Sequence, residues 1–426
     1  MGDTPQRFGF WKSVLFALVI CLTFLGGLEG ALRALGYESS AMDPYEAFVR
    51  HRPLFELRDG FHRTRKSRTR FFHAQSFAAA KEPASFRFFV VGGSMAYGYE
   101  LQDPARGSFV HRLESLLRQR EPSRRIEGVN VGGISYASYR LVGLVEEVLD
   151  YEPDLIVVAT GHNEFLEARH YADLVDHASW LDRVLYEVRI AHLLRDLLET
   201  AQARFARSVR PAAPSDPVLQ AEYVGERYIV RDAREYRLTL DHFTRNLERI
   251  IDLARARGIP VMLMTLPSNL RDWPPFHTVT PNDAAKQVME RDLNLGVAHL
   301  KARRFRAALA LARSAIAANE RAAVFHYLAA RSLDGLGDHA AAKRHYVLAK
   351  DTDGFPHRAL SDFNERVREI AAERDVILVD GEAVFERAAR DGIPGNDLFL
   401  DHCHPNARGH RLLAEAIAAH VAADLP

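Results

Sequence analysis

The chain has 426 residues, close to three times the length of a typical domain of about 150, which predicts two domains or one domain with large insertions. Hydrophobic residues make up 47% and charged residues 26%, which excludes a disordered or fibrous chain. The 56 basic residues balance 56 acidic ones, so no excess charge indicates a nucleic-acid partner, and two cysteines cannot form a disulfide framework.

The first predicted element is a membrane-spanning helix. Residues 14–28 carry no charge, and a helix over residues 14–35 would be about 33 Å long, enough to cross a bilayer. A cleaved signal peptide or a buried soluble helix would look similar, but no clean cleavage site follows the apolar run. We therefore expect residues 1–36 to form an uncleaved single-pass anchor. Basic residues on both sides do not decide its orientation; we expect the body outside the cytoplasm, in the periplasm, as is usual for short bacterial N-terminal anchors.

Beyond the anchor, residues 37–84 are rich in Arg, His and Phe without a clean period, and we expect a juxtamembrane arm that packs partly on the body. Apolar runs of strand length then alternate with amphipathic helical stretches. Strands are predicted at 86–91, 126–131, 155–159, 259–265 and 376–379, with helices at 108–120, 139–149, 238–257, 362–374 and 409–423. This alternation predicts a doubly wound three-layer α/β domain, in which ligands bind at the carboxyl ends of the strands.

Two segments interrupt the alternation. Residues 170–237 combine helical stretches with a proline-rich stretch, and we expect them to form a helical cap. Residues 286–354 contain an internal repeat with a period of 34 residues, typical of tetratricopeptide repeats. Small residues recur at that period: Gly296 as Ala330, Ala308 as Ala342, and Ala315 as Ala349. An alanine-rich helical hairpin whose register matches by chance is the alternative. The α/β domain is then expected in two parts, 85–285 and 355–426.

Polar motifs follow the predicted strands. Ser94 comes after the first strand and a glycine pair, so a tight turn can project its hydroxyl next to a helix N-terminus, which stabilises negative charge. Asn163 follows the strand at 155–159, and its amide can donate to a developing oxyanion. Each motif has a plain alternative: the first is an ordinary turn, and Asn163 can cap the strand end as an Asx turn.

The third motif lies near the C-terminus. Asp401 and His404 are three residues apart, so the carboxylate can hold the imidazole Nδ1–H while Nε2 faces a serine. Asp401, His402, Cys403 and His404 are also potential metal ligands. Adjacent residues in one short segment rarely converge on one ion, and no second ligand cluster is evident in the sequence. We therefore expect a Ser-His-Asp triad, without a metal or another cofactor.

Together, in this order, the motifs resemble those of the SGNH (GDSL-like) hydrolase superfamily, over about residues 84–169, 238–275 and 355–426. The resemblance implies a flavodoxin-like three-layer domain with a five-stranded parallel sheet. It implies Ser94 as nucleophile with Asp401 and His404, and an oxyanion hole formed by Ser94, Ser135 and Asn163. With the repeats and the N-terminal span, the run Gly-His-Asn-Glu-Phe at 161–165 looks like a membrane-anchored bacterial branch.

Three positions depart from the family pattern. Its Gly-Asp-Ser is Gly92, Gly93 and Ser94 here, and its Gly-x-Asn-Asp ends in Glu164. Ser135 stands where the family usually has an oxyanion glycine. A serine N–H can still donate, although the added Cβ narrows the hole; Gly132 or Gly133 could serve if the loop is shifted.

The resemblance implies a serine-dependent acyl-ester hydrolase, an esterase or deacetylase acting on a glycan or lipid ester outside the cytoplasm. An O-acyltransferase using the same triad is one alternative. Another is a catalytically degenerate scaffold that binds a protein partner through the repeats. No dinucleotide fingerprint, phosphate loop or basic groove indicates a cofactor or a nucleic acid.

The loop after the fourth predicted strand is a candidate substrate-binding element. It contains an aromatic platform in Trp273 and hydrogen-bond donors in Asn269 and Arg271. Aromatic faces stack on sugar rings and arginine forms directed hydrogen bonds, so this mixture suits a sugar or an anionic leaving group. In the structural alternative, Arg271 pairs with Asp272 and Trp273 packs under the cap.

Overall fold

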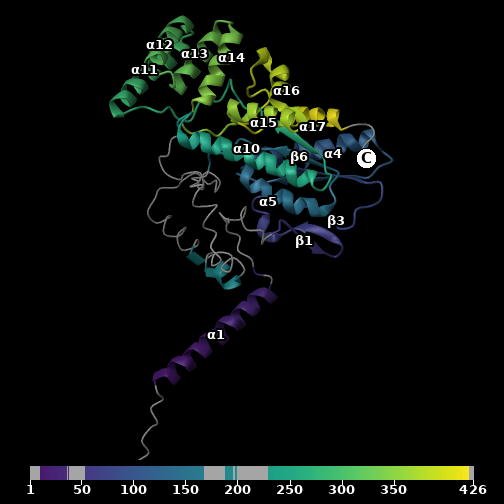
Figure 1. Ribbon diagram of the computed structural model, residues 1–426. Coiled ribbons are helices and arrows are strands. Elements are labelled where there is room, and N and C mark those ends of the chain that lie inside the picture. Colours follow the sequence, from purple (N-terminus) through teal and green to yellow (C-terminus); the bar gives the residue numbers. More distant parts are fainter. Residues whose placement is uncertain are drawn as a thin grey trace, which may run out of the picture. The chain divides into compact units, whose positions relative to one another are not determined.

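The computed structural model of the chain describes residues 10–35, 37, 53–166, 188–194, 197–198 and 229–421 (Figure 1). The chain divides into two compact units, one of residues 1–52 and 170–215, the other of residues 53–169 and 216–426. Most of the expected cap at 170–237 lies outside the described residues. Its last residues, from Arg234 on, already belong to the long helix α10 (Arg234–Arg255).

The first unit contains the apolar helix α1 (Phe10–Ala34). Its stretch Trp11–Ala34 is long and apolar enough to cross a membrane, and a signal sequence near an N-terminus has the same character. Large apolar side chains such as Leu15, Phe16 and Phe24 are exposed on it. A helix that is apolar on all sides requires an apolar environment, so α1 is consistent with either a signal sequence or a single-pass anchor.

A five-stranded parallel sheet forms the centre of the second unit, as predicted. In spatial order its strands are β5 (Ile126–Gly132), β4 (Phe86–Gly92), β6 (Leu155–Ala159), β7 (Val261–Thr265) and β8 (Ile377–Asp380). Numbered along the chain this is the order 2-1-3-4-5, which is characteristic of the flavodoxin-like fold. The first strand in the chain, β4, therefore lies inside the sheet between β5 and β6.

Helices cover both faces of the sheet (Figure 1). One apolar core contains Phe89, Val91 and Ile156 from the strands and side chains of α5 (Ser138–Val148), α10 and α15 (Ser361–Glu373). The other core contains Phe88, Val90 and Val157 and side chains of α4 (Phe109–Arg120), α16 (Gly381–Ala388) and α17 (Ala407–His420). Successive side chains of a strand point to opposite faces, and here both faces are buried. This explains why the strands are continuous apolar runs.

The register of the sheet aligns the ends of its three neighbouring strands. Gly92 pairs with Gly132 on one side and with Ala159 on the other. A Cβ on Gly92 would lie 2.5 Å from the Ala159 carbonyl oxygen, and one on Gly132 would lie 2.3 Å from the Tyr97 nitrogen. Only glycine fits at these two positions, so the loops after β4, β5 and β6 leave the sheet close together.

The described part of the expected juxtamembrane arm forms a separate three-stranded antiparallel sheet. Its strands are β1 (Phe55–Arg58), β2 (Phe61–Thr64) and β3 (Ser76–Ala78). Phe55, Phe72 and Phe77 are buried in the core shared with α5 and α10. Glu147 of α5 also accepts hydrogen bonds from the N–H groups of Leu54 (2.6 Å) and Phe55 (2.9 Å). Residues 53–84 thus pack against the α/β domain.

Four helices are inserted between β7 and α15: α11 (Asp283–Lys301), α12 (Phe305–Ala318), α13 (Ala323–Gly335) and α14 (His339–Asp351). They form two successive hairpins with an apolar core of their own (Figure 1). The small residues noted in the sequence lie where helices cross: Ala308, Ala330 and Ala342 are fully buried, and a Cβ on Gly296 would lie 2.3 Å from the Leu328 side chain. That these hairpins are tetratricopeptide repeats stays a prediction.

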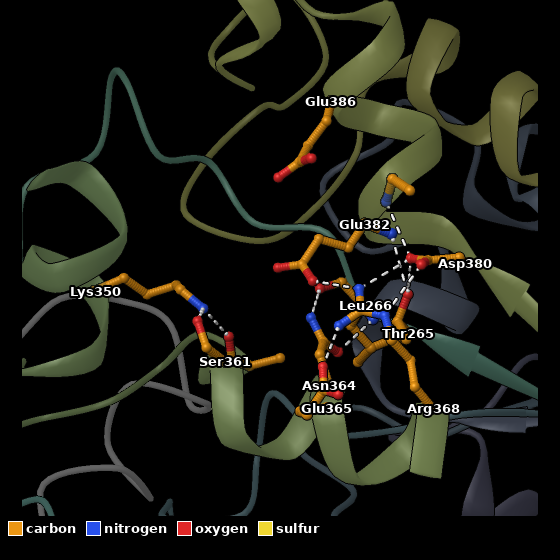
Figure 2. Close-up of polar contacts among 12 residues, drawn as sticks. Thr265, Leu266, Lys350, Ser361, Asn364, Glu365, Arg368, Asp380, Glu382 and Glu386 are labelled. Carbon is orange, nitrogen blue, oxygen red and sulfur yellow. Dashed lines mark hydrogen bonds and ion pairs between the residues drawn. The ribbon is translucent and has the colours of Figure 1, made fainter. Parts of the chain in front are cut away.

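Buried polar contacts fasten this insertion and the strand ends (Figure 2). Lys350 of α14 donates to the Ala359 carbonyl (2.8 Å) and to Ser361 Oγ (3.3 Å), at the start of α15. Within α15, Asn364 donates to the Leu266 carbonyl and accepts from the Leu266 N–H, both at 2.9 Å. These two bonds hold the backbone directly after β7, and this segment leads into the loop that contains residues 269–273.

Candidate active site

The sheet presents Ser94 at the carboxyl end of β4. Ser94 is the first residue of the short helix α2 (Ser94–Tyr97) and follows Gly93, which has an extended backbone. A Cβ on Gly93 would lie 2.7 Å from Asn163 Nδ2, so the glycine allows the Asn163 amide to lie directly against the serine turn. The hydroxyl is only slightly accessible, with Ser94 8% exposed.

His404 lies between Ser94 and Asp401. Its Nε2 is 2.8 Å from Ser94 Oγ, and its Nδ1 is 2.5 Å from Asp401 Oδ2. The second carboxylate oxygen of Asp401 accepts the backbone N–H groups of Cys403 (2.9 Å) and His404 (2.8 Å). Because the ionised carboxylate only accepts, the proton is assigned to Nδ1 and the lone pair of Nε2 faces the serine hydroxyl. This arrangement is suited to removing a proton from the serine.

The electrostatics of Asp401 support that proton assignment. Burial alone would raise the pKa of the Asp401 carboxyl, but the hydrogen bonds that it accepts from the His404 side chain and backbone outweigh burial and hold this pKa well below its usual value. Asp401 is therefore ionised at neutral pH. A fixed negative charge at Nδ1 would stabilise an imidazolium if Nε2 took up a proton.

The loops after β5 and β6 bring the expected oxyanion donors beside the serine turn. Asn163 donates one amide hydrogen to the Tyr136 carbonyl (2.9 Å), and no residue in the described part of the chain accepts the second one. Ser135 has a left-handed backbone with φ 61°, the conformation that favours glycine at this position. Among the described residues, none accepts a hydrogen bond from the Ser135 N–H.

Glu164 braces these two loops, a role that the sequence did not reveal. Its carboxylate accepts from the Ser138 N–H (2.8 Å) and from Ser138 Oγ–H (2.8 Å), and Asn246 of α10 donates to the same Oγ (3.0 Å). The longer side chain of glutamate spans from the loop after β6 to the start of α5. The signal in the sequence was an acidic residue directly after Asn163, which we noted only as a departure from the family pattern.

Asn269 has a different environment from the one expected. We expected it to bind substrate, but it is fully buried. Its side-chain nitrogen donates to the Asp401 carbonyl (2.9 Å) and to Asn396 Oδ1 (2.9 Å), so both amide hydrogens are used within the protein. This corrects the expectation: the donors of Asn269 face the loop that contains Asp401.

The substrate-binding expectation for Arg271 also needs correction. Its guanidinium donates to Asp334 of α13 (2.9 and 3.1 Å), to Asp391 (2.9 Å) and to the Arg390 carbonyl (3.0 Å), and the residue is 4% exposed. The structural alternative named Asp272 as its partner, but Asp272 instead accepts from the Asn396 N–H (2.9 Å). Arg271 joins the loop after β7 to the helical insertion.

Aromatic rings surround His402, next to the serine site. The ring centroids of Trp273 and Phe276 are 5.7 and 5.6 Å from that of His402, which is 5.6 Å from that of His404. Burial is the main cause that lowers the pKa of His402 to about 3, so its imidazole is neutral. Phe276 is exposed and Trp273 is partly exposed, so these two rings are accessible near Asp401 and His404.

The same residues offer potential metal ligands. Ligand atoms of Asp401, His402, Cys403 and His404 lie within 4.8 Å of one another. Both ring nitrogens of His404 are, however, engaged by Ser94 and Asp401, so an ion would have to displace these bonds. A second group, Asp334, His339 and Asp391, already binds the Arg271 cation. The donor sets thus fit a triad and an ion-pair cluster better than a metal.

No protein-family model and no curated protein sequence matches the chain. Among solved structures it is similar to an acetyl xylan esterase, with a TM-score of 0.36 and 12% identity over 79% of this chain and 100% of that one. A GDSL-like lipase from Bacteroides thetaiotaomicron has a TM-score of 0.32 and 11% identity, covering 81% and 91% of the two chains. A lipase/acylhydrolase from Enterococcus faecalis has a TM-score of 0.35 and 14% identity, covering 79% and 95%. Similarity at this level carries no argument about activity, which has to come from the site itself.

Proposed function

We propose that the protein is a serine-dependent acyl-ester hydrolase with Ser94, His404 and Asp401 as its catalytic triad. The continuous hydrogen-bond chain from Ser94 Oγ through both ring nitrogens of His404 to Asp401 carries this proposal. Ser94 and His404 lie 310 positions apart in the sequence, and the fold brings them to hydrogen-bond distance. A catalytically inactive scaffold would not need this chain of hydrogen bonds.

The reaction follows from the geometry. As Ser94 Oγ bonds to the acyl carbon, its proton passes to His404 Nε2, and the carbonyl π electrons move onto oxygen. Collapse of the tetrahedral intermediate breaks the bond to the alcohol, which takes the proton from His404 and leaves. Water then repeats the sequence on the acyl-enzyme and releases the acid, restoring Ser94.

The N–H groups of Ser94 and Ser135 and the Asn163 amide are the proposed oxyanion donors. Supporting this, Asn163 lies against the serine turn, and the Ser135 N–H has no acceptor among the described residues. Each such donor in other serine enzymes contributes roughly 10²- to 10³-fold in rate.

The proposed substrate is an ester on a glycan or a lipid outside the cytoplasm. Two observations support it: α1 is long and apolar enough to anchor the chain in a membrane, and Trp273 and Phe276 offer aromatic surface around His402, the neighbour of His404. Aromatic faces pack on sugar rings and on acyl chains alike. The single-pass topology with a periplasmic body is part of the proposal, as is a protein partner for the helical insertion.

A second candidate is an O-acyltransferase that uses the same triad. The low exposure of Ser94 (8%) and His404 (6%) favours it, because a buried acyl-enzyme limits access of water. The accessible aromatic cluster could seat an acceptor alcohol in place of water. The ratio of products separates the two reactions, since with added alcohol the new ester is the main product of the transferase and the free acid that of the hydrolase.

Turnover of a small chromogenic acyl ester by the full-length protein tests the proposal. Ser94→Ala is expected to lower kcat/KM by roughly 10⁴-fold or more, the usual effect of losing a triad nucleophile. The control is Ser115→Ala on α4, because the Ser115 hydroxyl donates to the His111 carbonyl of its own helix (2.9 Å) and to no other residue that the structure describes. Equal activity of Ser94→Ala and Ser115→Ala would refute the proposal.

A further inference from the structure

We propose that Asn269 is a positioning residue for the triad: its buried amide holds the backbone of Asp401, so that the carboxylate meets His404 at hydrogen-bond distance. The inference rests on the proposed function, because it assigns Asn269 a purpose only if Asp401 and His404 act in catalysis. Asn269 does not touch the reacting atoms and acts through Asp401.

Three hydrogen bonds join Asn269 to the segment that contains the triad acid. The side-chain nitrogen donates to the Asp401 carbonyl (2.9 Å) and to Asn396 Oδ1 (2.9 Å). The backbone N–H of Asn269 donates to the His402 carbonyl (3.0 Å). Two consecutive carbonyls, at 401 and 402, are therefore bound by one fully buried residue.

The turn that contains Asp401 is closed on itself, and this makes its attachment important. The Leu400 N–H donates to the His404 carbonyl (2.9 Å), and Phe399 pairs with Pro405 in an antiparallel bridge. Asp401 Oδ1 also binds N–H groups inside the turn. These bonds set the shape of the turn, whereas the bonds from Asn269 set its place relative to β7 and the sheet.

Asn269 is itself held rigidly. Arg358 Nη1 donates to the Asn269 carbonyl (2.9 Å) and to the Trp273 carbonyl (3.0 Å). Two residues on, the ion pairs of Arg271 fasten the loop to α13, and Tyr327 of α13 donates to the Arg271 carbonyl (2.8 Å). The helical insertion thus supports the loop that supports the triad acid.

The expected effect is a loss in kcat. A misplacement of reacting groups by about 1 Å can cost roughly 10²-fold in rate. Removing the amide should let the 401–402 backbone shift, so Asn269→Ala is expected to lower kcat by roughly 10- to 100-fold while KM changes little. A substrate-binding role would instead raise KM.

The matched control is Asn364→Ala. Asn364 is also a buried asparagine, and its side chain makes two backbone hydrogen bonds to Leu266 in the segment leaving β7 (Figure 2). Among the described residues, it makes no hydrogen bond to the 401–404 turn. The two variants should lose similar stability, so any difference in kcat reports on the triad rather than on folding.

The experiment measures kcat and KM of the full-length variants for the small chromogenic acyl ester. It also records the far-downfield proton NMR signal of the His404 Nδ1–H···Asp401 bond. That signal is assigned by its loss in Asp401→Asn. Asn269→Ala is expected to shift or broaden it, and Asn364→Ala to leave it in place. A second variant, Asn269→Asp, keeps the size and the acceptor for the Asp272 N–H (3.1 Å) but loses the donors, and should behave like Asn269→Ala.

Equal kcat and an equal signal in Asn269→Ala and Asn364→Ala would overturn the proposal. So would unfolding of both Asn269 variants while Asn364→Ala folds, since that outcome assigns Asn269 a purely structural role. The proposed function fails separately, if folded wild-type protein shows the NMR signal but no turnover that depends on Ser94.

Discussion

Replacing Arg271 with alanine should destabilise the protein rather than impair substrate binding. The guanidinium is almost completely buried and binds two carboxylates, with Asp334 16% and Asp391 34% exposed. Burial opposes ionisation of Asp334, but hydrogen bonds from Arg271 and His339 outweigh it and lower the pKa of this carboxyl. Arg271→Ala would leave that charge without its cation, with His339 (2.9 Å) and the Tyr346 hydroxyl (3.3 Å) as its hydrogen-bond partners.

The size of the effect follows from these exposures. Removing one partner of a buried ion pair costs about 3–5 kcal/mol. Because Asp391 is one-third exposed and can be rehydrated, we expect the low end, about 3 kcal/mol. The matched control is Arg249→Ala, since Arg249 is 63% exposed where it pairs with Glu146 (3.1 Å). Such surface pairs contribute about 0–1 kcal/mol.

Urea unfolding of the full-length protein, followed by tryptophan fluorescence, measures both variants. The Arg271→Ala midpoint should fall well below that of Arg249→Ala, together with slower labelling of Ser94 by a small fluorophosphonate probe, because the same loop contains Asn269. If Arg271→Ala keeps its midpoint and its labelling but raises KM for a natural substrate, the structural interpretation is wrong and the substrate-binding one returns.

Three further outcomes are expected. Burial lowers the pKa of His357 to about 4 and the pKa values of His402 and His410 to about 3. These three imidazoles are therefore neutral in the folded protein, whereas in the unfolded protein they take up protons below about pH 6.5. Stability should thus fall as the pH drops from 7 to 5.5, by about 1 kcal/mol per histidine and about 3 kcal/mol for the three. An unchanged urea midpoint over that range would contradict this. Ser135→Gly should stabilise the fold by about 1 kcal/mol, because glycine adopts the left-handed backbone at this position without strain. The fluorophosphonate probe should still label Ser94 in this variant, because the N–H of residue 135 remains; a large loss of labelling would show that the serine side chain has a role. Through α1 the full chain should stay with membranes under alkaline carbonate extraction; release of intact protein, or a mature N-terminus beyond residue 30, would exclude an anchor.

The sheet could be predicted from the sequence because both of its faces are buried. Each strand is therefore a continuous apolar run, and all five predicted strands exist with small changes at their ends. The predicted strand at 259–265 starts at Val261 because Pro260 has no N–H to donate to a neighbouring strand. The positions of Ser94 and Asn163 followed from the same pattern, since loops after parallel strands meet at one edge, whereas His404 lies beyond α16, in the segment that precedes α17.

The roles of Asn269, Arg271 and Glu164 could not be predicted in this way. The partners of Asn269 and Arg271 lie 132 and 63 positions further along the chain, and no local pattern specifies such pairings. An exposed donor and a buried, fully bonded donor look alike in sequence. The small sheet of β1 to β3 was also missed, because its strands have three or four residues and weak alternation.

The link between Ser94, His404 and Asp401 is tested most directly by the rate at which a fluorophosphonate probe labels full-length protein. Wild-type protein should be labelled, Ser94→Ala should not, and His404→Ala should slow labelling by about a hundredfold or more because the serine loses its base. His402→Ala should stay within a few-fold of wild type, since its ring contacts the aromatic cluster rather than Ser94. Absence of labelling in folded wild-type protein, or labelling that requires His402 and not His404, would contradict the proposed triad.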